Sequence, residues 1–396
     1  MRHAAAAPLR VVMVVGNLPG LNTGKGGHYY SVKEIASELS CHFSVHVVVL
    51  GQSVPDPLVG SPGLTWIECG SMPTPRTLGR IGKMLREACP DAIHCMDSSS
   101  LLFMRMANLR RRIPICWTKC GGRPLRHYTP RGAPDIVFHR EDRDLYRQRG
   151  FDPLLIPNRF RGPDRENAFT DFTTNVPPRL VRISRICEKY REGLEKTIQF
   201  HAALLEQCPG ATLEIIGYPE HPDVLTRLRA MSGSSVRFLT DDETTREASR
   251  HLPRYTVAVA SGRAAMEAIS YGLPTLTTPT GSSAPVLVQE KNFDVLLAAN
   301  FSERANTSET MHTTVRDVQF LLADPEALNI YRQWTDHVYR QHISIRSAVE
   351  HYRGLYDNLI GNGFKDSIFD LMKHLALFEV SLLLRRRRNA QTGFEA

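Results

Sequence analysis

Residues 261–274 of this chain are Ser-Gly-Arg-Ala-Ala-Met-Glu-Ala-Ile-Ser-Tyr-Gly-Leu-Pro, and short apolar segments precede and follow them at 256–260 and 275–278. The two flanking segments have the composition of buried strands. The stretch between them predicts a helix over 264–271, with Ser261 as its N-cap. Because a strand, a helix and a strand in this order join neighbours of a parallel sheet, these residues predict an α/β fold.

The same alternation of strand-like and helix-like segments runs through most of the chain. Val11–Val15 is a continuous apolar run, typical of a strand buried on both faces, and residues 30–39 then place apolar side chains on one face of a helix. Further strands are expected at 44–50, 92–94, 113–117, 180–184, 211–217 and 235–239, and further helices at 101–111 and 192–208. Such an alternation predicts parallel sheets covered by helices.

The polar, proline-rich stretch 161–178 interrupts this alternation and predicts a linker. It separates an N-terminal α/β domain at 1–160 from a C-terminal α/β domain at 179–345, and C-terminal helices with a basic tail follow at 346–396. Ligands of parallel α/β sheets bind beyond the carboxyl ends of the strands. We therefore expect the two domains to face each other across a cleft that holds the site.

Composition argues against several classes of protein. The 396 residues carry a formal net charge of +8, and no apolar run is long enough to span a membrane, which argues against an integral membrane protein. The eight cysteines include no Cys-x-x-Cys pair, so we expect free thiols in a reducing cytoplasm and no zinc site. Pro8 and Arg10 interrupt the apolar start before a signal-peptide core forms. No basic stretch interleaved with aromatic residues indicates a nucleic acid partner.

Three stretches carry residue types suited to phosphate or sugar. Residues 24–27, Gly-Lys-Gly-Gly, precede the first helix, where glycine lets backbone amides approach an anion. The stretch is not a P-loop, because the glycine spacing differs and Gly26 replaces the required Ser or Thr. Arg185 and Lys189 follow the first strand of the C-terminal domain and offer cations to a diphosphate. Glu267, one turn into its helix, offers a carboxylate to the hydroxyls of a ribose.

Each of these stretches also has a plain structural interpretation. The glycines are compatible with a tight turn, the cations with a solvated loop, and Glu267 with an ordinary surface position on a helix. Their combination and their order along the chain favour the functional interpretation.

In that order, the pieces resemble the GT-B glycosyltransferases of the family 4 type, over roughly residues 10–360. The matching segments are Gly26-Gly27, Asp91–His94, Ile156–Asn158, Ser184–Lys189, Pro209–Gly217 and Glu267-Ala268 with Gly272–Pro274. The resemblance implies two Rossmann-like domains and the transfer of a sugar from a nucleotide diphosphate sugar with retention of anomeric configuration.

The resemblance also implies roles for individual residues. Glu267 would be the second Glu of the family's E-x7-E signature and would hold the donor ribose. Arg185 and Lys189 would neutralise the leaving diphosphate, and the backbone of Gly26 and Gly27 would approach the same phosphates. Protein cations would then do the work that a metal ion does elsewhere, so we expect neither a metal nor another cofactor.

The chain departs from the family pattern in its donor-binding signature. Val259 stands where the first Glu of the signature would fall, and an isopropyl group cannot accept a hydrogen bond from a sugar. We therefore expect the donor sugar to be recognised differently, through Gly262 or Arg263. The spacing from Arg185 to Lys189 is also one residue shorter than in the family.

A second departure lies in the N-terminal domain. Lys119 stands near the position of a His that the family often carries, and we expect its ammonium to contact donor phosphate or acceptor; the alternative is a surface lysine. His94 is expected to be a packed strand residue and not a catalytic base.

The last segment, 367–388, is an amphipathic stretch that ends in Arg385–Arg388. One interpretation is a helix that lies on an anionic membrane surface at the cytoplasmic face, beside a lipid-linked or glycan acceptor. The other is a helix that docks on the protein itself with a solvated basic end.

The sequence therefore predicts a cytoplasmic hexosyltransferase that uses a UDP- or GDP-sugar in polysaccharide or glycolipid biosynthesis. Two alternatives share the architecture: a nucleotide-sugar 2-epimerase, and a sugar-nucleotide-binding protein without catalysis. Isomerisation of the donor without an acceptor would indicate the first alternative, and binding without turnover would indicate the second.

Overall fold

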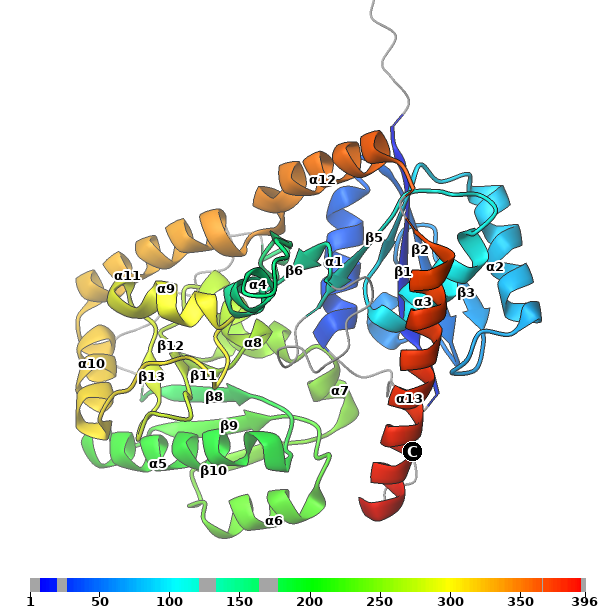
Figure 1. Cartoon of the computed structure of the whole chain (residues 1–396). Coiled ribbons are helices and arrows are strands. Elements are labelled where there is room, and N and C mark those ends of the chain that lie inside the picture. Colours follow the sequence, from blue (N-terminus) through cyan, green and yellow to red (C-terminus); the bar gives the residue numbers. More distant parts are fainter. Residues whose placement is uncertain (1–7, 20–26, 121–132, 164–176, 365, 393–396) are drawn as a thin grey trace, which may run out of the picture. The chain divides into compact units, whose positions relative to one another are not determined.

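The computed structural model of the protein describes residues 8–19, 27–120, 133–163, 177–364 and 366–392, with 385–392 described as backbone (Figure 1). The chain divides into two compact units. The first unit contains residues 1–161 and 345–396, and the second unit contains residues 162–344. The C-terminal segment therefore belongs to the same unit as the N-terminal residues. Most of the expected linker at 161–178 lies outside the described residues.

The first unit is a parallel α/β structure. Its seven-stranded sheet has the order β3-β2-β1-β4-β5-β6-β7. The strands are β1 (Arg10–Asn17), β2 (Ser44–Gly51), β3 (Thr65–Glu68), β4 (Ala92–Cys95), β5 (Ile115–Lys119), β6 (Ile136–Val137) and β7 (Leu154–Leu155). The helices are α1 (Gly27–Leu39), α2 (Pro75–Ala88), α3 (Ser98–Asn108), α4 (Arg140–Arg147), α12 (Val349–Asn362) and α13 (Ile368–Thr392).

Strand β1 is buried on both faces, as its continuous apolar run predicts. Val11, Met13 and Val15 pack into a core with side chains of α1 and α12. Val12 and Val14 point the other way and pack with side chains of α2, α3 and α13. Because successive side chains of a strand alternate between faces, one run of apolar residues serves two cores.

His94 on β4 is a packed strand residue, which confirms the prediction. Its Nδ1 lies 2.9 Å from the hydroxyl of Tyr356 on α12, and its Nε2 lies 2.7 Å from Oγ1 of Thr118 on β5. Burial lowers the pKa of His94 to about 3, so the ring is neutral near pH 7. The imidazole thus joins the C-terminal helix α12 to the sheet.

The second unit is also an α/β structure, with a six-stranded sheet in the order β10-β9-β8-β11-β12-β13. The strands are β8 (Arg179–Ile183), β9 (Thr212–Ile216), β10 (Val236–Leu239), β11 (Val257–Ala260), β12 (Thr275–Thr277) and β13 (Val286–Leu287). Among the described strands of this sheet, β13 alone pairs antiparallel. The helices are α5 (Arg191–Gln207), α6 (Pro222–Ala230), α7 (Asp242–Arg246), α8 (Arg263–Ser270), α9 (Glu290–Ala298), α10 (Met311–Ala323) and α11 (Pro325–Val338).

The order of strands reverses direction in the middle of the second sheet. Strand β8 comes first in the sequence of this unit, and it has β9 on one side and β11 on the other. Open α/β sheets bind ligands beyond the carboxyl ends of the strands at such a reversal. The ends of β8 and β11 therefore define where a site is expected in this unit.

Candidate functional site

The carboxyl ends of β8 and β11 lie side by side. Ile183 pairs with Ala260 in the register of these two parallel strands. The segments that begin at Ser184 and Ser261 therefore leave the sheet next to each other. The first of these segments carries the cations predicted to bind diphosphate, and the second begins helix α8 with the predicted donor-binding residues.

A glycine at the end of β9 allows close packing beside the first segment. A Cβ atom added at Gly217 would lie 1.8 Å from the carbonyl oxygen of Ser184, a distance that no side chain tolerates. The amide of Ser184 donates to the carbonyl of Ile216 at 3.1 Å, which holds the two backbones together. Gly217 thus lets the loop that carries Arg185 lie against the end of β9.

Arg185 and Lys189 converge on the hydroxyl of Tyr190. Nη2 of Arg185 lies 3.5 Å from that oxygen and Nζ of Lys189 lies 2.9 Å from it. Both cations also lie over the Tyr190 ring, and Arg185 pairs with Glu220 at 2.7 Å. Burial alone would raise the pKa of Tyr190, but Lys189 and Arg185 outweigh it and lower that pKa. The structure therefore brings the two predicted cations together.

Tyr190 is a residue that the sequence analysis missed. The sequence signal for Tyr190 is only its position directly after Lys189. That signal is weak, because an aromatic residue beside a lysine is common in loops. In the structure its hydroxyl contacts both cations, and the charged ends of both side chains lie over its ring.

Helix α8 begins at Arg263, one residue before the predicted start at 264, and the predicted N-cap was wrong. Gly262 is the N-cap, with φ of +61°, and no side chain caps this end of the helix. The hydroxyl of Ser261 instead lies 3.4 Å from Oγ1 of Thr278. A serine cap requires extended backbone at the cap position, whereas this chain enters the helix through the left-handed region, which favours glycine.

The amide of Gly262 donates to the carbonyl of Phe301 at 2.9 Å, which ties the start of α8 to the loop after α9. Asn300 and Phe301 in that loop both have positive φ, of +55° and +51°. Two consecutive non-glycine residues in this region store strain, and such strain concentrates at functional sites. The first-turn amides of α8 meanwhile offer an anion-binding helix end.

Arg263 and Glu267 form an ion pair along one face of α8. Nε of Arg263 donates to Oε1 of Glu267 at 2.7 Å, and both side chains are only 15% exposed. A carboxylate accepts several hydrogen bonds, so Glu267 can hold the guanidinium and a sugar hydroxyl at once. The structure thus brings together the predicted donor-binding residues Gly262, Arg263 and Glu267.

A carboxylate missed by the sequence analysis, Glu303, lies near the same edge of the sheet. Its Oε1 lies 3.7 Å from Nη2 of Arg182 on β8, and Nη1 of Arg182 donates to Thr278 at 3.2 Å. A Cβ at Gly193 in the first turn of α5 would lie 2.7 Å from Glu303 Oε1, so glycine makes room for the pair. Val259, by contrast, is fully buried in the apolar core beneath. Glu303 gave no motif signal, because its partner is distant in sequence.

The candidates of the first unit are placed differently. Gly26 lies outside the described residues, and Gly27 is the exposed first residue of α1. Lys119 ends β5, and its Nζ lies 2.7 Å from Oδ2 of the buried Asp142 on α4. The Lys119 ammonium thus joins β5 to α4. Its predicted contact with donor phosphate or acceptor stays a prediction.

Asp97 occupies the carboxyl edge of the first sheet, where its strand order reverses between β1 and β4. Its carboxylate accepts the amide of Gly16 at 2.7 Å and the amide of Ser100 at 2.8 Å, so it caps α3 and holds the turn after β1. Asp97 was not predicted as a site residue, although an Asp before a run of Ser is a common N-cap signal.

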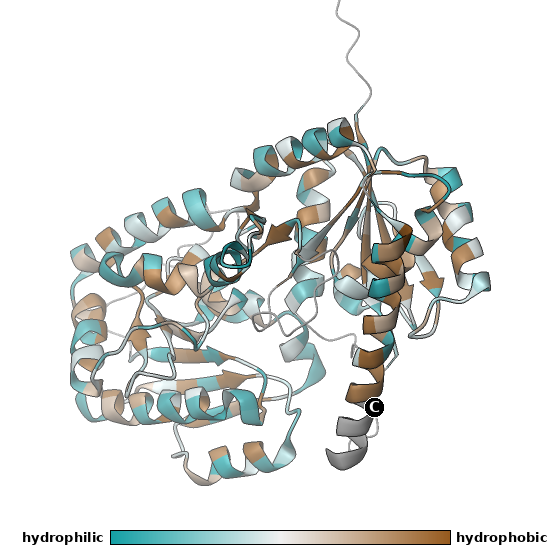
Figure 2. Ribbon diagram, in the orientation of Figure 1, coloured by the Kyte–Doolittle hydropathy of each residue, from teal (hydrophilic) through white to brown (hydrophobic). Residues whose placement is uncertain are grey.

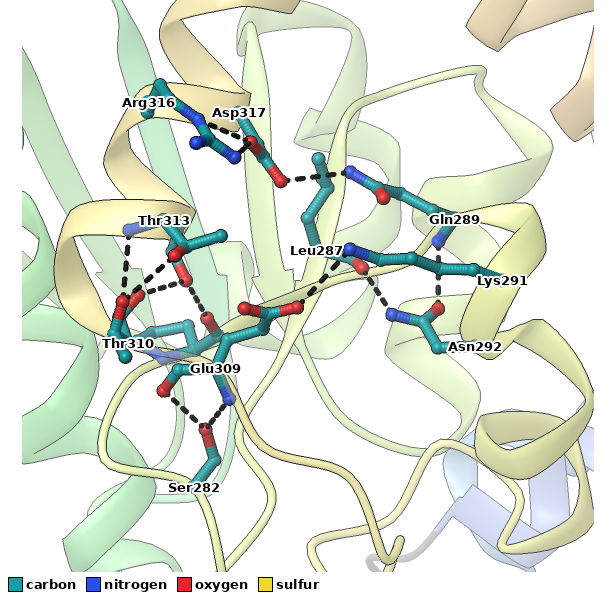
Figure 3. Close-up of polar contacts among 12 residues, drawn as sticks. Ser282, Leu287, Gln289, Lys291, Asn292, Glu309, Thr310, Thr313, Arg316 and Asp317 are labelled. Atoms are coloured by element: carbon teal, nitrogen blue, oxygen red, sulfur yellow. Dashed lines mark hydrogen bonds and ion pairs between the residues drawn. The ribbon is translucent and has the colours of Figure 1, made fainter.

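A second polar cluster lies near the amino end of β12, away from the carboxyl edge of the sheet (Figure 3). It lies there because β13 runs antiparallel to β12, so the residues that follow β13 leave the sheet at that end. Its shallow pocket is lined by Leu287, Gln289, Lys291, Glu309, Thr314 and Asp317. Lys291 pairs with Glu309 at 3.3 Å, and the Gln289 amide donates to Asp317 at 3.5 Å. These side chains satisfy one another and join α9 to α10, so we assign the cluster a structural role.

Three further properties bear on function. Within the described ranges, no group of three or more His, Cys, Asp or Glu side chains is arranged as a metal site. In the same part of the chain, no helix combines the length and apolarity needed to cross a membrane. All eight cysteines are free thiols, as predicted.

No protein-family model matches the chain, and no curated protein matches it by sequence. Solved structures do match. A glycosyltransferase from Rickettsia africae is 14% identical, with 90% of this chain and 99% of that chain covered and a TM-score of 0.65. HepE from Anabaena, solved with UDP and glucose, is 13% identical, with 88% and 99% covered and a TM-score of 0.59.

A putative UDP-N-acetylglucosamine 2-epimerase from Listeria monocytogenes is also similar, at 12% identity, with 88% of this chain and 95% of that chain covered and a TM-score of 0.53. Identities this low establish a shared fold and leave the reaction open. The chain therefore has the fold of the GT-B glycosyltransferases, with two Rossmann-like α/β domains, as the sequence predicts.

Proposed function

We propose that this protein is a retaining glycosyltransferase of the family 4 type that transfers a hexose from a nucleotide diphosphate sugar to an acceptor hydroxyl. Arg185 and Lys189 bind the diphosphate, and the uncapped start of α8 at Gly262 supplies backbone amides to it. Glu267 accepts hydrogen bonds from the ribose. Arg263 orients Glu267 and contributes to recognition of the donor sugar.

One observation carries this proposal: the two cations and the uncapped helix start leave neighbouring strands at the point where the strand order reverses. In a solvated loop, Arg185 and Lys189 would not be expected to contact the same hydroxyl, as they do at Tyr190. An ordinary surface glutamate would not be expected to be mostly buried against an arginine, as Glu267 is against Arg263. The fold adds support, because the similar Anabaena protein was solved with UDP and glucose.

In the proposed reaction, the bond between sugar C1 and the diphosphate oxygen breaks and a bond between C1 and the acceptor oxygen forms. The acceptor proton passes to the leaving diphosphate, so charge develops on the phosphates in the transition state. Fixed cations and amides that meet this charge lower the barrier, and the loss of one such donor typically costs on the order of 10²–10³ in turnover. The proposed reaction uses no metal and no organic cofactor, because Arg185 and Lys189 supply the positive charge.

We further propose that the donor is a UDP- or GDP-sugar and that the acceptor is a lipid-linked or growing glycan in polysaccharide or glycolipid biosynthesis. The proposed location is the cytoplasm, beside the inner face of the membrane. The absence of a carboxylate at Val259 supports a donor sugar held by different contacts from those of the resembled family.

The first experiment is a thermal-shift measurement with UDP, GDP, ADP and CMP. A nucleotide at 100 times its Kd adds about 2.7 kcal/mol of stability, enough to raise the Tm by several degrees. We expect one nucleotide to stand out with the native protein and to lose its effect in Glu267→Ala. Equal shifts with every nucleotide, or no shift at millimolar concentration, would contradict the assignment of the donor site.

A second experiment separates transfer from epimerisation, since the fold is shared with a putative epimerase. The protein is incubated with the preferred donor, first without any acceptor and then with a panel of glycan acceptors. Transfer predicts that the donor sugar keeps its configuration at C2 and leaves the nucleotide only when an acceptor is present. Isomerisation of the donor without an acceptor would overturn the proposal.

A further inference from the structure

Helix α13 is docked on the first unit through one of its faces. Leu371, Phe378 and Leu382 are buried in the core that contains α2 and α3. His374 is buried beside them, and its Nδ1 lies 3.0 Å from Nη1 of Arg105 on α3. Arg105 also pairs with Asp366 at 3.0 Å, just before the helix begins. Apolar packing and this buried polar contact therefore fix which face of α13 turns toward the protein.

The face of α13 turned away from the protein also carries large apolar side chains, beside the exposed Lys373 and Glu379. Six large side chains along it are between 52% and 79% exposed: Ile368, Phe369, Met372, Val380, Leu383 and Leu384. These are six of the fifteen exposed large hydrophobic side chains among the described residues, gathered on one helix. Figure 2 shows the hydrophobic colour recurring along α13.

Helix geometry separates the two faces. At 100° per residue, the docked side chains from Leu371 to Leu382 fall within an arc of about 80°, and Phe369, Met372, Val380 and Leu383 fall within a second arc of about 80°. The centres of the two arcs are roughly 160° apart. A helix that only docked on the protein would need one apolar arc, so the second arc requires its own explanation.

The charge at the end of the helix indicates which partner the second face fits. Residues 368–392 contain five basic and two acidic residues, and four of the basic residues are Arg385–Arg388, which continue α13 directly after Leu384. A second copy of the chain would bring another positive cluster, whereas an anionic lipid surface attracts this one. An apolar helix face with adjacent arginines is typical of helices that lie in a membrane interface.

We propose that the outward face of α13, defined by Ile368, Phe369, Met372, Val380, Leu383 and Leu384, binds an anionic lipid surface together with Arg385–Arg388. The docked face keeps α13 attached to the first unit while the outward face enters the headgroup region. This inference rests on the proposed function. Binding to the lipid surface would hold the enzyme where lipid-linked acceptors lie.

The experiment measures co-sedimentation of the full chain with vesicles of phosphatidylcholine, with or without phosphatidylglycerol. The first variant, Phe369→Ser/Met372→Ser/Leu383→Ser, removes apolar area from the outward face. Its matched control is Phe320→Ser/Ile330→Ser, since these residues of α10 and α11 are equally apolar and each 60% exposed. The second variant replaces Arg385–Arg388 with Gln.

We expect the native chain and the control to bind phosphatidylglycerol vesicles alike, and binding to weaken as salt is added. The triple serine variant should bind at least about tenfold more weakly, because three apolar side chains no longer leave water. The glutamine variant should lose up to about a thousandfold in affinity for the anionic vesicles and little for the neutral ones.

Native-like binding by both variants would overturn the proposal, and so would equal binding of the native chain to neutral and anionic vesicles. If the native chain forms a dimer and binds no vesicles, and both variants are monomeric, then a second copy of the chain occupies the face. Thermal unfolding of each variant with UDP and GDP verifies folding. A preserved nucleotide shift with lost vesicle binding separates failure of the lipid surface from failure of the donor site.

Discussion

Arg182 Nη2 and Glu303 Oε1 lie 3.7 Å apart near the carboxyl edge of the second sheet, and the arginine side chain is fully buried. Burial lowers the pKa of Arg182 to about 10 and raises the pKa of Glu303. Both groups therefore pay a desolvation cost, which their mutual attraction offsets in part. Because Glu303 lies two residues after Phe301, the pair holds the loop that binds the amide of Gly262.

Arg182→Met should destabilise the second unit by about 3–5 kcal/mol, because it leaves the Glu303 carboxylate without its buried partner. The double variant Arg182→Met/Glu303→Leu should recover most of that loss, since no charge then remains buried. Urea unfolding of the three proteins checks this. A double variant as unstable as the single one would show that packing of the arginine stem, and not the charge, is what matters.

Gly217→Ala should lower the free energy of unfolding by about 1–3 kcal/mol, since its methyl group would meet the carbonyl oxygen of Ser184. The matched control is Gly281→Ala, because no atom lies within 4 Å of a Cβ at that exposed glycine. Thermal unfolding of the two variants gives the comparison. Equal Tm values for the two would contradict the close approach of the backbones.

Arg185→Met and Lys189→Met should each reduce kcat by on the order of 10²–10³, because each removes a cation that meets charge on the leaving diphosphate. Since both cations contact Tyr190, their effects should not be additive in the double variant. Arg227→Met, which removes an exposed arginine paired with Asp223 on α6, serves as the control. Turnover in Arg185→Met equal to that of the control would refute the phosphate role.

Glu267→Gln should raise the KM for the donor by roughly tenfold to a hundredfold, because a charged acceptor of ribose hydrogen bonds is replaced by a neutral amide. Glu290→Gln changes an exposed glutamate at the start of α9 in the same way and should leave KM unchanged. Initial rates with varied donor and saturating acceptor measure both. An unchanged KM in Glu267→Gln would place the ribose elsewhere.

The stability of the protein should fall as the pH falls below about 6.5. The pKa of His94 is about 3 in the folded protein, below the 6.5 of an unfolded histidine, so the unfolded state binds a proton that the folded state rejects. Between pH 6.5 and pH 5 His94 alone should cost about 2 kcal/mol. Burial lowers the pKa of His28, His46 and His201 in the same direction, so these residues add to the slope.

His94→Gln should reduce this slope while it retains hydrogen-bonding capacity toward Thr118 and Tyr356. Urea unfolding at several pH values measures the slope for the native protein and the variant. Parallel curves would mean that the pKa of His94 is the same in the folded and unfolded states, which would contradict its burial as a neutral ring.

Much of the site was predictable because its residues are local in sequence. Arg185 and Lys189 meet because they leave the same strand, and Arg263 and Glu267 meet because they are four residues apart on a helix. The predicted serine cap failed because a capping residue needs a particular backbone conformation, and that conformation was set by the contact of Gly262 with Phe301. The local sequence could not predict a contact between residues as far apart as Gly262 and Phe301.

The fold and the last helix also combine features that the sequence pattern predicts with contacts that it does not predict. The sequence by itself determined the two α/β domains, because a strand buried on both faces and a helix with an apolar stripe each leave a periodic pattern. Only the tertiary structure decided that Lys119 binds Asp142, that Arg182 binds Glu303, and that α13 docks through one of its two apolar arcs. A periodic pattern indicates which side chains are buried. The residues that they contact depend on how segments distant in the sequence pack together.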